Sequence, residues 1–320
     1  MTCTGFVHQA LCYASDEEFL AGTVDFVRAG LAADDAVLAV VARHNVGLLR
    51  DALGGAEKEV DYVDAVDWYG FPARTLGRYH DYCTEHARGG ARGVRVIGEP
   101  VWAGRTPFET REWIRYESLV NVAFAESGHR ILCPYDTRVL PADVLAGVRR
   151  THPELALGSG GLRSSGRYTE PAEFVAECDG LGTEPAAPAG SVREVGFRRG
   201  ESVAARLAAA EFARRGGLDR ERARDMAAAV HEVTVNAVRF GGGGGVLRLW
   251  QDADWVVCEV ADHGGGARAA PVEDAGFLGH VPPDPYAATG HGLWVVRQLS
   301  DLVTERIRTR GSVVRLYFRR

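Results

Sequence analysis

The sequence has a single lysine, Lys58, and carries the rest of its positive side-chain charge on arginine. A Walker A loop needs a glycine-rich turn that ends in Lys-Ser or Lys-Thr, because that lysine reaches the phosphates of the nucleotide. Lys58 stands in Gly-Gly-Ala-Glu-Lys-Glu, which does not fit this pattern. The shortage of lysine therefore excludes a P-loop nucleotide site.

Long apolar runs, paired cysteines and an excess of basic residues are also missing. The longest apolar runs, such as residues 36–42, are too short to span a bilayer, and residues 1–10 do not resemble a signal peptide. We therefore expect a cytoplasmic protein without a membrane partner. The cysteines are scattered without a C-x-x-C pair, which favours free thiols over a structural zinc site. The net charge of -6 argues against direct binding of nucleic acid.

The chain is long enough for two domains, and its composition places a break near residue 180. Residues 181–191 are rich in proline, glycine and alanine and have no periodicity, which is typical of a linker. We therefore predict one domain at residues 1–180 and another at 192–320.

The first part of the chain alternates short apolar runs with helical patterns. The expected strands are residues 8–13, 36–42, 94–97 and 130–133, and the expected helices are residues 16–32, a segment ending at 53, and residues 72–88 and 107–127. Alternation of strand and helix favours a layered α/β domain with a mainly parallel sheet.

The second part groups its elements differently. We expect helices at residues 202–215 and 219–240, paired strands at 246–251 and 255–261, a helix from about residue 292, and a final hairpin of 303–308 with 312–319. The five glycines at 241–245 are expected to form a flexible loop. Helices beside an antiparallel sheet indicate a two-layer α/β sandwich.

The predicted helix 219–240 carries two neighbouring stripes. Its apolar stripe consists of Met226, Val230, Val233 and Ala237, and its polar stripe consists of Glu232, Asn236 and Arg239. One line on this helix thus offers a carboxylate, an amide and a guanidinium beside the core. A solvated helix face would give the same spacing, so the stripe alone does not establish a site.

Three glycine motifs follow this helix. They are Asp262-His-Gly264-Gly-Gly266 after a strand, Thr289-Gly290-His-Gly292-Leu293 before a helix, and Gly311-Ser312 before the last strand. Glycines allow a close approach of backbone to ligand, and a helix N-terminus attracts anions. Each motif taken singly also fits an ordinary turn.

In this order the motifs resemble the conserved boxes of the GHKL ATPases (gyrase, heat-shock chaperone, histidine kinase, MutL). Glu232-Val-Thr-Val-Asn236 resembles the N box, Asp262-His-Gly264 the G1 box and Gly290-His-Gly292-Leu293 the G2 box, over residues 192–320. The resemblance implies a Bergerat-type two-layer α/β sandwich. Within that class, the compact size and the sequence around Glu232 are most similar to the anti-sigma-factor serine kinases.

The resemblance also implies the role of each site residue. Glu232 would be the general base, and Asn236 would bind the Mg²⁺ that bridges the ATP phosphates. Asp262 would accept a hydrogen bond from the adenine amino group, Ser312 would support adenine, and Gly264 and Gly266 would lie against base and ribose. Gly290 and Gly292 with Leu293 would hold phosphates, and Arg239 would reach a phosphate. Residues 267–289 would form the lid over ATP.

The resemblance implies two kinds of partner, of which the protein would use one or both: a sigma factor that it binds, and a STAS-type anti-sigma antagonist that it phosphorylates on Ser or Thr. The resemblance also suggests a homodimer. Two alternatives stay open. Pro282, Pro283 and Pro285 in the lid, and Ser312 where the family has Thr, favour an ATP-dependent binding switch without phosphotransfer. A histidine-kinase-like relay fits less well, because His152 precedes a proline and no helical hairpin with an exposed histidine is expected before the module.

The N-terminal part carries its own set of motifs. Gly98-Glu99-Pro-Val-Trp102, Glu117 with Asn121 one helical turn apart, and Leu132-Cys133-Pro-Tyr135-Asp136, together with His8 and Tyr13, resemble the MEDS sensory domain over residues 5–155. The resemblance implies a RecA-like α/β fold without a P-loop, and a sensor for an unknown small molecule.

Two questions about the N-terminal motifs remain open from the sequence. Glu99, Glu117 and Asp136 either line a pocket at the carboxyl edge of the sheet or only buttress the fold. Cys133 is either a redox sensor or a buried structural thiol, and we favour the second interpretation.

Overall fold

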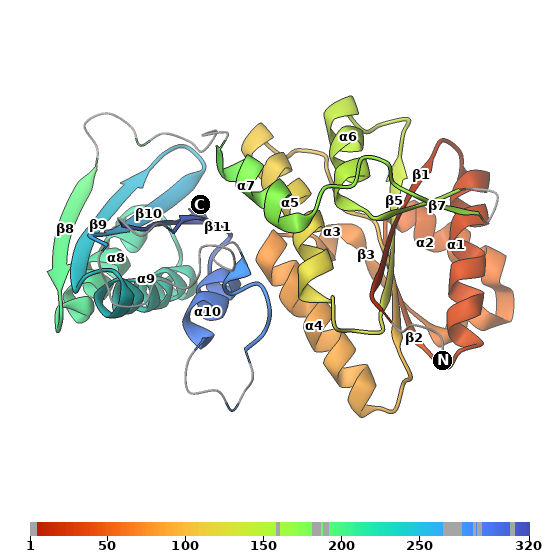
Figure 1. Ribbon diagram of the computed structural model, residues 1–320, viewed down its shortest axis with the longest axis horizontal. Coiled ribbons are helices and arrows are strands. Elements are labelled where there is room, and N and C mark those ends of the chain that lie inside the picture. The colour runs from red at the N-terminus through yellow and green to blue at the C-terminus, as the bar shows by residue number, and fades with distance from the viewer. Residues whose placement is uncertain are drawn as a thin grey trace. The chain divides into compact units, whose positions relative to one another are not determined.

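The computed structural model describes residues 5–157, 161–180, 187, 192–264, 277–283, 286, 290–307 and 311–320. The chain divides into two compact units (Figure 1). One unit comprises Met1–Gly70 and Arg78–Gly180, and the other comprises Phe71–Gly77 and Leu181–Arg320. Among the described helices, none combines the length and apolar character needed to cross a bilayer. The predicted linker 181–191 lies almost wholly outside the described residues.

The first unit is built on a seven-stranded sheet with the order β3-β2-β4-β5-β1-β6-β7. Its strands are β1 (Val7–Tyr13), β2 (Ala36–Val41), β3 (Val60–Asp64), β4 (Val94–Gly98), β5 (Arg130–Asp136), β6 (Glu154–Ala156) and β7 (Leu162–Ser164). All neighbouring strands are parallel except β6 and β7. The carboxyl ends of β2, β3, β4 and β5 therefore meet at one edge.

Helices cover both faces of this sheet, with α1 and α2 on one face and α4 and α5 on the other (Figure 1). The helices are α1 (Asp16–Leu31), α2 (Arg43–Leu53), α3 (Ala65–Trp68), α4 (Pro72–Arg88), α5 (Pro107–Ala123), α6 (Ala142–Thr151) and α7 (Pro171–Gly180), with a 3₁₀ turn at Gly54–Glu59. Helix α5 starts at a capping box in which Thr106 and Glu109 satisfy each other's backbone N–H groups. It ends four residues before the predicted end at 127.

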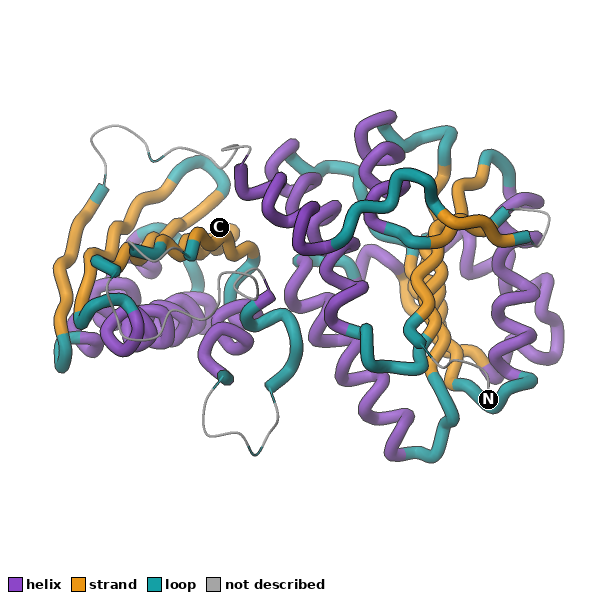
Figure 2. The backbone as a smooth tube through the Cα atoms, viewed as in Figure 1, coloured by secondary structure: helices purple, strands orange, loops and turns teal. Residues whose placement is uncertain are grey.

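The second unit is a five-stranded antiparallel sheet, β11-β12-β10-β9-β8, with its helices against one face (Figure 2). Its elements are β8 (Arg193–Arg198), α8 (Ser202–Arg215), α9 (Arg220–Phe240), β9 (Gly244–Gln251), β10 (Trp255–Asp262), α10 (His291–Leu299), β11 (Leu302–Arg306) and β12 (Val313–Arg319). Met226, Val230, Val233 and Ala237 are buried in one core with the inner face of the sheet, as their spacing predicted. The predicted α/β classes are thus confirmed: a layered, parallel-rich unit and a two-layer sandwich.

The glycine run at 241–245 corrects one prediction. We expected a flexible loop, but Gly244 and Gly245 form the start of β9, where Gly245 pairs with Asp262 of β10. A Cβ on Gly245 would lie 2.2 Å from the carbonyl oxygen of Ala261. Glycine is needed here because the neighbouring strand leaves no room for a side chain.

Candidate functional site

Glu232 and Asn236 lie one turn apart on α9, beside the buried stripe and half-buried themselves. Both face the start of α10. A Cβ on Gly292 would lie 3.0 Å from Oε2 of Glu232 and 3.3 Å from Nδ2 of Asn236. Gly290, in the left-handed region with φ of 102°, is the N-cap of α10. The first turn of α10 therefore presents its backbone directly to a carboxylate and an amide.

Asp262 closes β10 with its side chain held by two backbone groups. Its Oδ1 accepts hydrogen bonds from the backbone N–H of Gly264 and of Ser312, both at 2.9 Å. The backbone N–H of Asp262 in turn donates to the carbonyl of Ser312 at 3.0 Å. Within the described residues, Oδ2 of Asp262 has no hydrogen-bond partner, so this oxygen is available to a donor from a ligand.

The C-terminal end of α9 connects the Glu232 and Asn236 pair with Asp262. A Cβ on Gly241, the C-cap residue of α9, would lie 2.3 Å from Cγ and 2.5 Å from Oδ2 of Asp262. The Gly241 carbonyl also accepts a hydrogen bond from the backbone N–H of His263 at 3.2 Å. One helix thus carries Glu232 and Asn236 on its side and supports Asp262 at its end.

The remaining predicted residues fall around this arrangement. Leu293 packs under Gly279, where a Cβ would lie 2.8 Å from the Leu293 Cβ. Arg239 is exposed and lies over the ring of Phe240 at 5.3 Å, and none of its described contacts reaches another predicted site residue. Gly266 and most of the predicted lid, 267–289, lie outside the described residues.

Sequence reasoning missed Arg297, a buried residue of α10. Its Nε donates to the carbonyl of Leu278 at 3.0 Å, and its guanidinium pairs with the buried carboxylate of Glu305 at 2.6 Å. Arg297 therefore joins α10 to β11 by a buried ion pair, and to Leu278 of the predicted lid by a hydrogen bond. An arginine inside an otherwise apolar helix was the available signal.

The N-terminal unit has a cavity of 760 Å³ at the carboxyl edge of its sheet. Its lining residues include Arg43, Glu99, Trp102, Arg111 and Asp136. This volume is in the range of small-molecule sites, and open α/β sheets bind ligands at this edge. The predicted pocket at the strand ends is thus present, and Glu99 and Asp136 belong to it.

Both cavity carboxylates are also held by internal partners. Glu99 accepts from Tyr13, Asn45 and the backbone N–H of Ala42 at 2.8–3.1 Å. Desolvation, followed by the nearby Glu99 charge, raises the pKa of Tyr13, so its hydroxyl stays a donor. Asp136 is paired with Arg138, whose hydrogen bonds lower the pKa of that carboxyl. Glu99 and Asp136 therefore buttress the fold and line the cavity at once.

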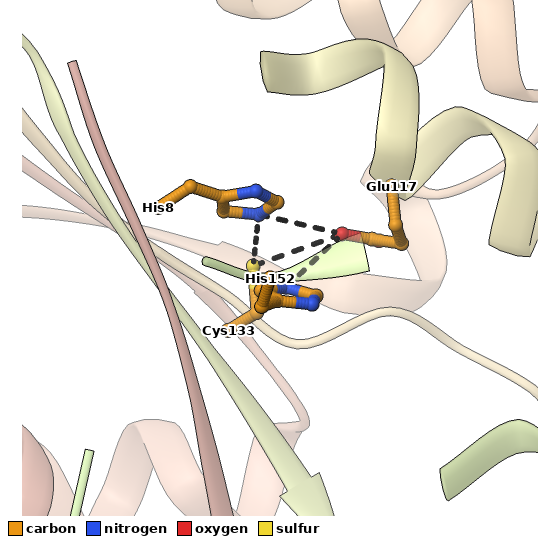
Figure 3. A group of neighbouring side chains, drawn as sticks. All are labelled: His8, Glu117, Cys133 and His152. Atoms are coloured by element: carbon orange, nitrogen blue, oxygen red, sulfur yellow. Dashed lines mark hydrogen bonds and ion pairs between the residues drawn. The ribbon is translucent and has the colours of Figure 1, made fainter. Parts of the chain in front are cut away.

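Glu117 does not line the cavity. It lies in a separate buried cluster with His8, Cys133 and His152 (Figure 3). Burial raises the pKa of Cys133 well above that of a free thiol and lowers the pKa of His152. With 3% of its surface exposed, the Cys133 thiol fits a buried role better than that of an accessible redox sensor.

The first unit is thus a layered α/β domain with a pocket at the edge of its sheet. The second unit is a two-layer sandwich with three glycine motifs and a helix that carries Glu232 and Asn236. Comparison with protein-family models gives two matches: MEDS, the MEthanogen/methylotroph, DcmR Sensory domain, at residues 7–153, and the histidine kinase-like ATPase domain at residues 199–318. The chain therefore carries an N-terminal MEDS domain and a C-terminal ATPase domain of the GHKL class, as both resemblances predicted. A search of curated proteins gave no match. The two domains together indicate a signalling regulator, and the ATPase domain implies ATP binding.

Proposed function

We propose that this protein is a signal-responsive, anti-sigma-type regulator that uses ATP and Mg²⁺ to phosphorylate Ser or Thr on a STAS-type antagonist, to sequester a sigma factor, or both. The observation that supports it best is the contact of Glu232 and Asn236 with the first turn of α10 at Gly292. This arrangement sets a carboxylate and an amide beside a helix N-terminus, which is suited to phosphate.

The residues present fit a nucleotide with its metal ion. Oδ2 of Asp262 can accept the adenine amino group, since Oδ1 is already held by Gly264 and Ser312. The Asn236 side-chain oxygen would hold Mg²⁺, which when bound supplies neutralising charge to the phosphates. At Gly292 any Cβ would fill the space between α9 and α10, so glycine keeps this approach open.

Glu232 would act on the nucleophile of the partner. Its carboxylate accepts the proton of a Ser or Thr hydroxyl while the hydroxyl oxygen bonds to the γ-phosphorus. The bond from that phosphorus to the bridging oxygen breaks, and ADP leaves with the electron pair. Glu232 is half-buried beside an apolar stripe, so it can be held in one orientation for this step.

Phosphotransfer is tested with recombinant STAS-domain proteins from the source organism, incubated with the full chain and ATP-Mg²⁺. Intact-mass analysis then measures phosphorylation for the wild type, for Glu232→Gln and for Glu221→Gln. Glu221 lies exposed in the first turn of the same helix and serves as the matched control. We expect transfer by the wild type and the control, and a loss of about 100-fold or more in Glu232→Gln with ATP affinity retained.

Transfer that does not depend on Glu232 would contradict the assigned role of this carboxylate. ATP binding without any transfer would instead support the second candidate, an ATP-dependent binding switch. This candidate is supported by the hydrogen bond from Arg297 to the Leu278 carbonyl, which holds one residue of the lid segment against α10. The switch predicts that ATP changes the affinity of the chain for its partner although no phosphate is transferred.

The N-terminal domain would receive the signal that sets this activity. The 760 Å³ cavity, with Trp102 for apolar contact and with charged groups held at its rim, suits a small polar or amphipathic molecule. A screen of small molecules for a thermal shift that is lost in Trp102→Ala tests this part independently of ATP.

A further inference from the structure

Four side chains with metal-binding atoms converge inside the MEDS domain (Figure 3). They come from four elements: His8 from β1, Glu117 from α5, Cys133 from β5 and His152 from the C-cap of α6. All four are buried, with 3% or less of their surface exposed. Their ligand atoms all lie within 4.8 Å of one another.

The two contacts between histidine and Glu117 in this cluster are too long for good hydrogen bonds. Oε2 of Glu117 lies 3.6 Å from Nε2 of His8 and 3.6 Å from Nε2 of His152, whereas N–H···O bonds span about 2.7–3.2 Å. The Cys133 sulfur lies 3.5 Å from Nε2 of His8 and 3.9 Å from Oε2 of Glu117. Within the cluster the Cys133 thiol is hydrogen-bonded to His8 and Glu117, whereas Glu117 has only long contacts with the two imidazoles.

These spacings match ligands that share one ion. Zinc bonds of about 2.0–2.3 Å to nitrogen, oxygen and sulfur in a tetrahedron place the ligand atoms about 3.3–3.7 Å apart. Of the six pairs among the four ligand atoms, three distances fall in this range, a fourth exceeds it by about 0.2 Å, and the other two are within 4.8 Å. Movements of about an ångström or less would close the four atoms on a metal.

Both imidazoles are oriented by their outer nitrogens. Nδ1 of His152 lies 2.9 Å from the carbonyl of Val148 and so donates to it. Nδ1 of His8 lies 3.1 Å from Oδ1 of Asn121, whose amide nitrogen donates to the carbonyl of Thr151 at 2.8 Å. Because Nδ1 carries the proton in each neutral ring, both Nε2 lone pairs face the cluster, and Nε2 of His152 also lies 3.4 Å from the Tyr135 hydroxyl. Such outer hydrogen bonds are the usual support of metal-bound histidine.

We propose that His8, Glu117, Cys133 and His152 bind one divalent transition-metal ion, with zinc as the best fit. Thiolate and imidazole ligands favour zinc over calcium or magnesium, and a closed set of four side chains fits its tetrahedral geometry. The charges also balance, because one thiolate and one carboxylate neutralise a divalent cation in a buried site. Binding releases the thiol proton, since the thiolate is the ligand.

The site shares a strand with the sensory cavity. Cys133 directly precedes Pro134 on β5, and Pro134 and Asp136 line the cavity. A metal bound by Cys133 would therefore fix the strand that forms part of the cavity wall. Metal occupancy is expected to alter the affinity of the cavity for its ligand.

The test uses the full chain, purified without a histidine tag, stripped of metal and reloaded without ATP. Inductively coupled plasma mass spectrometry measures the zinc content of the chain. X-ray absorption spectroscopy of the zinc-loaded wild type identifies the elements bound to the metal. We expect one zinc per chain, bound by one sulfur and three nitrogen or oxygen atoms. Reloading with Co²⁺ should give a thiolate-to-cobalt charge-transfer band.

Variants then assign the ligands. Cys133→Ser and His152→Gln should abolish the cobalt band or weaken zinc binding by about 100-fold or more, since each removes a direct ligand. Cys83→Ser, at another buried free cysteine of the same domain, should change neither. A wild-type chain that takes up no metal, or zinc without a sulfur neighbour, overturns the proposal even where a variant fails to fold. So does a cobalt band that survives in a folded Cys133→Ser variant.

Discussion

The backbone N–H of Ser312 donates a hydrogen bond to Oδ1 of Asp262 at 2.9 Å, while the backbone N–H of Asp262 donates to the Ser312 carbonyl at 3.0 Å. This reciprocal pair locks the end of β10 to the residue before β12. The carboxylate is therefore oriented by backbone rather than by a neighbouring side chain. Its second oxygen has no hydrogen-bond partner among the described residues.

Replacement of Asp262 by Asn should weaken ATP binding without destabilising the fold. The amide oxygen can still accept from Gly264 and Ser312, but the other atom becomes an NH₂ donor that opposes the adenine amino group. We expect ATP affinity to fall about 10- to 100-fold with little change in thermal stability. Calorimetric titration measures this effect, with Asp254→Asn in the exposed turn before β10 as the control. Unchanged affinity in Asp262→Asn would remove Asp262 from the site.

Gly241→Ala should disrupt the same carboxylate from the other side. The added Cβ would lie 2.3–2.5 Å from Asp262 side-chain atoms, so the carboxylate must move. We expect ATP affinity to fall about 10-fold or more, and the free energy of unfolding to fall by about 1–3 kcal/mol. Gly196→Ala in β8 is the matched control, because its Cβ would meet nothing within 4 Å. If both variants bind ATP equally well, the end of α9 does not position Asp262.

The MEDS domain should lose stability in mild acid through His80. Desolvation lowers the pKa of His80 to about 4, with His129 nearby as the second cause, and the ring stacks on Phe124. The unfolded chain binds this proton near pH 6.5, so stability present above pH 6.5 is lost as the pH falls toward 4. We expect His80→Gln to reduce the stability difference between pH 7 and pH 5 by about 1–2 kcal/mol.

Urea unfolding at both pH values measures this difference, read on the transition that ATP does not shift, which reports the MEDS domain. Wild type and variant with the same pH dependence would show that folding does not lower the pKa of His80.

Local motifs explain why the elements that carry the candidate ATP site could be predicted from the sequence. Glu232 and Asn236 share one helix, and Asp262, Gly264 and Ser312 stand at the ends of strands that alternation predicts, although the pairing of β10 with β12 was not predicted. The position of Arg297 could not be predicted in the same way, because its partners Leu278 and Glu305 depend on tertiary packing. The start of β9 was missed because glycine is ordinarily a loop residue, while here the close approach of β10 requires it.

The cluster of His8, Glu117, Cys133 and His152 shows the same limit more clearly. Spacing along the chain gave no metal signature, since the residues are far apart in sequence. Parallel pairing of β1 with β5 places His8 on the same sheet face as Ala10, the register partner of Cys133. Only the packing of α5 and the end of α6 over that face completes the set.

The most direct test of the account is calorimetric titration of the full chain with ATP, in Mg²⁺ and in EDTA, for the wild type and Asn236→Ala. The account predicts one ATP per wild-type chain in Mg²⁺, and a loss of affinity of about 10-fold or more both in EDTA and in the variant. No binding by the wild type, or binding that neither the metal ion nor Asn236 affects, would contradict it.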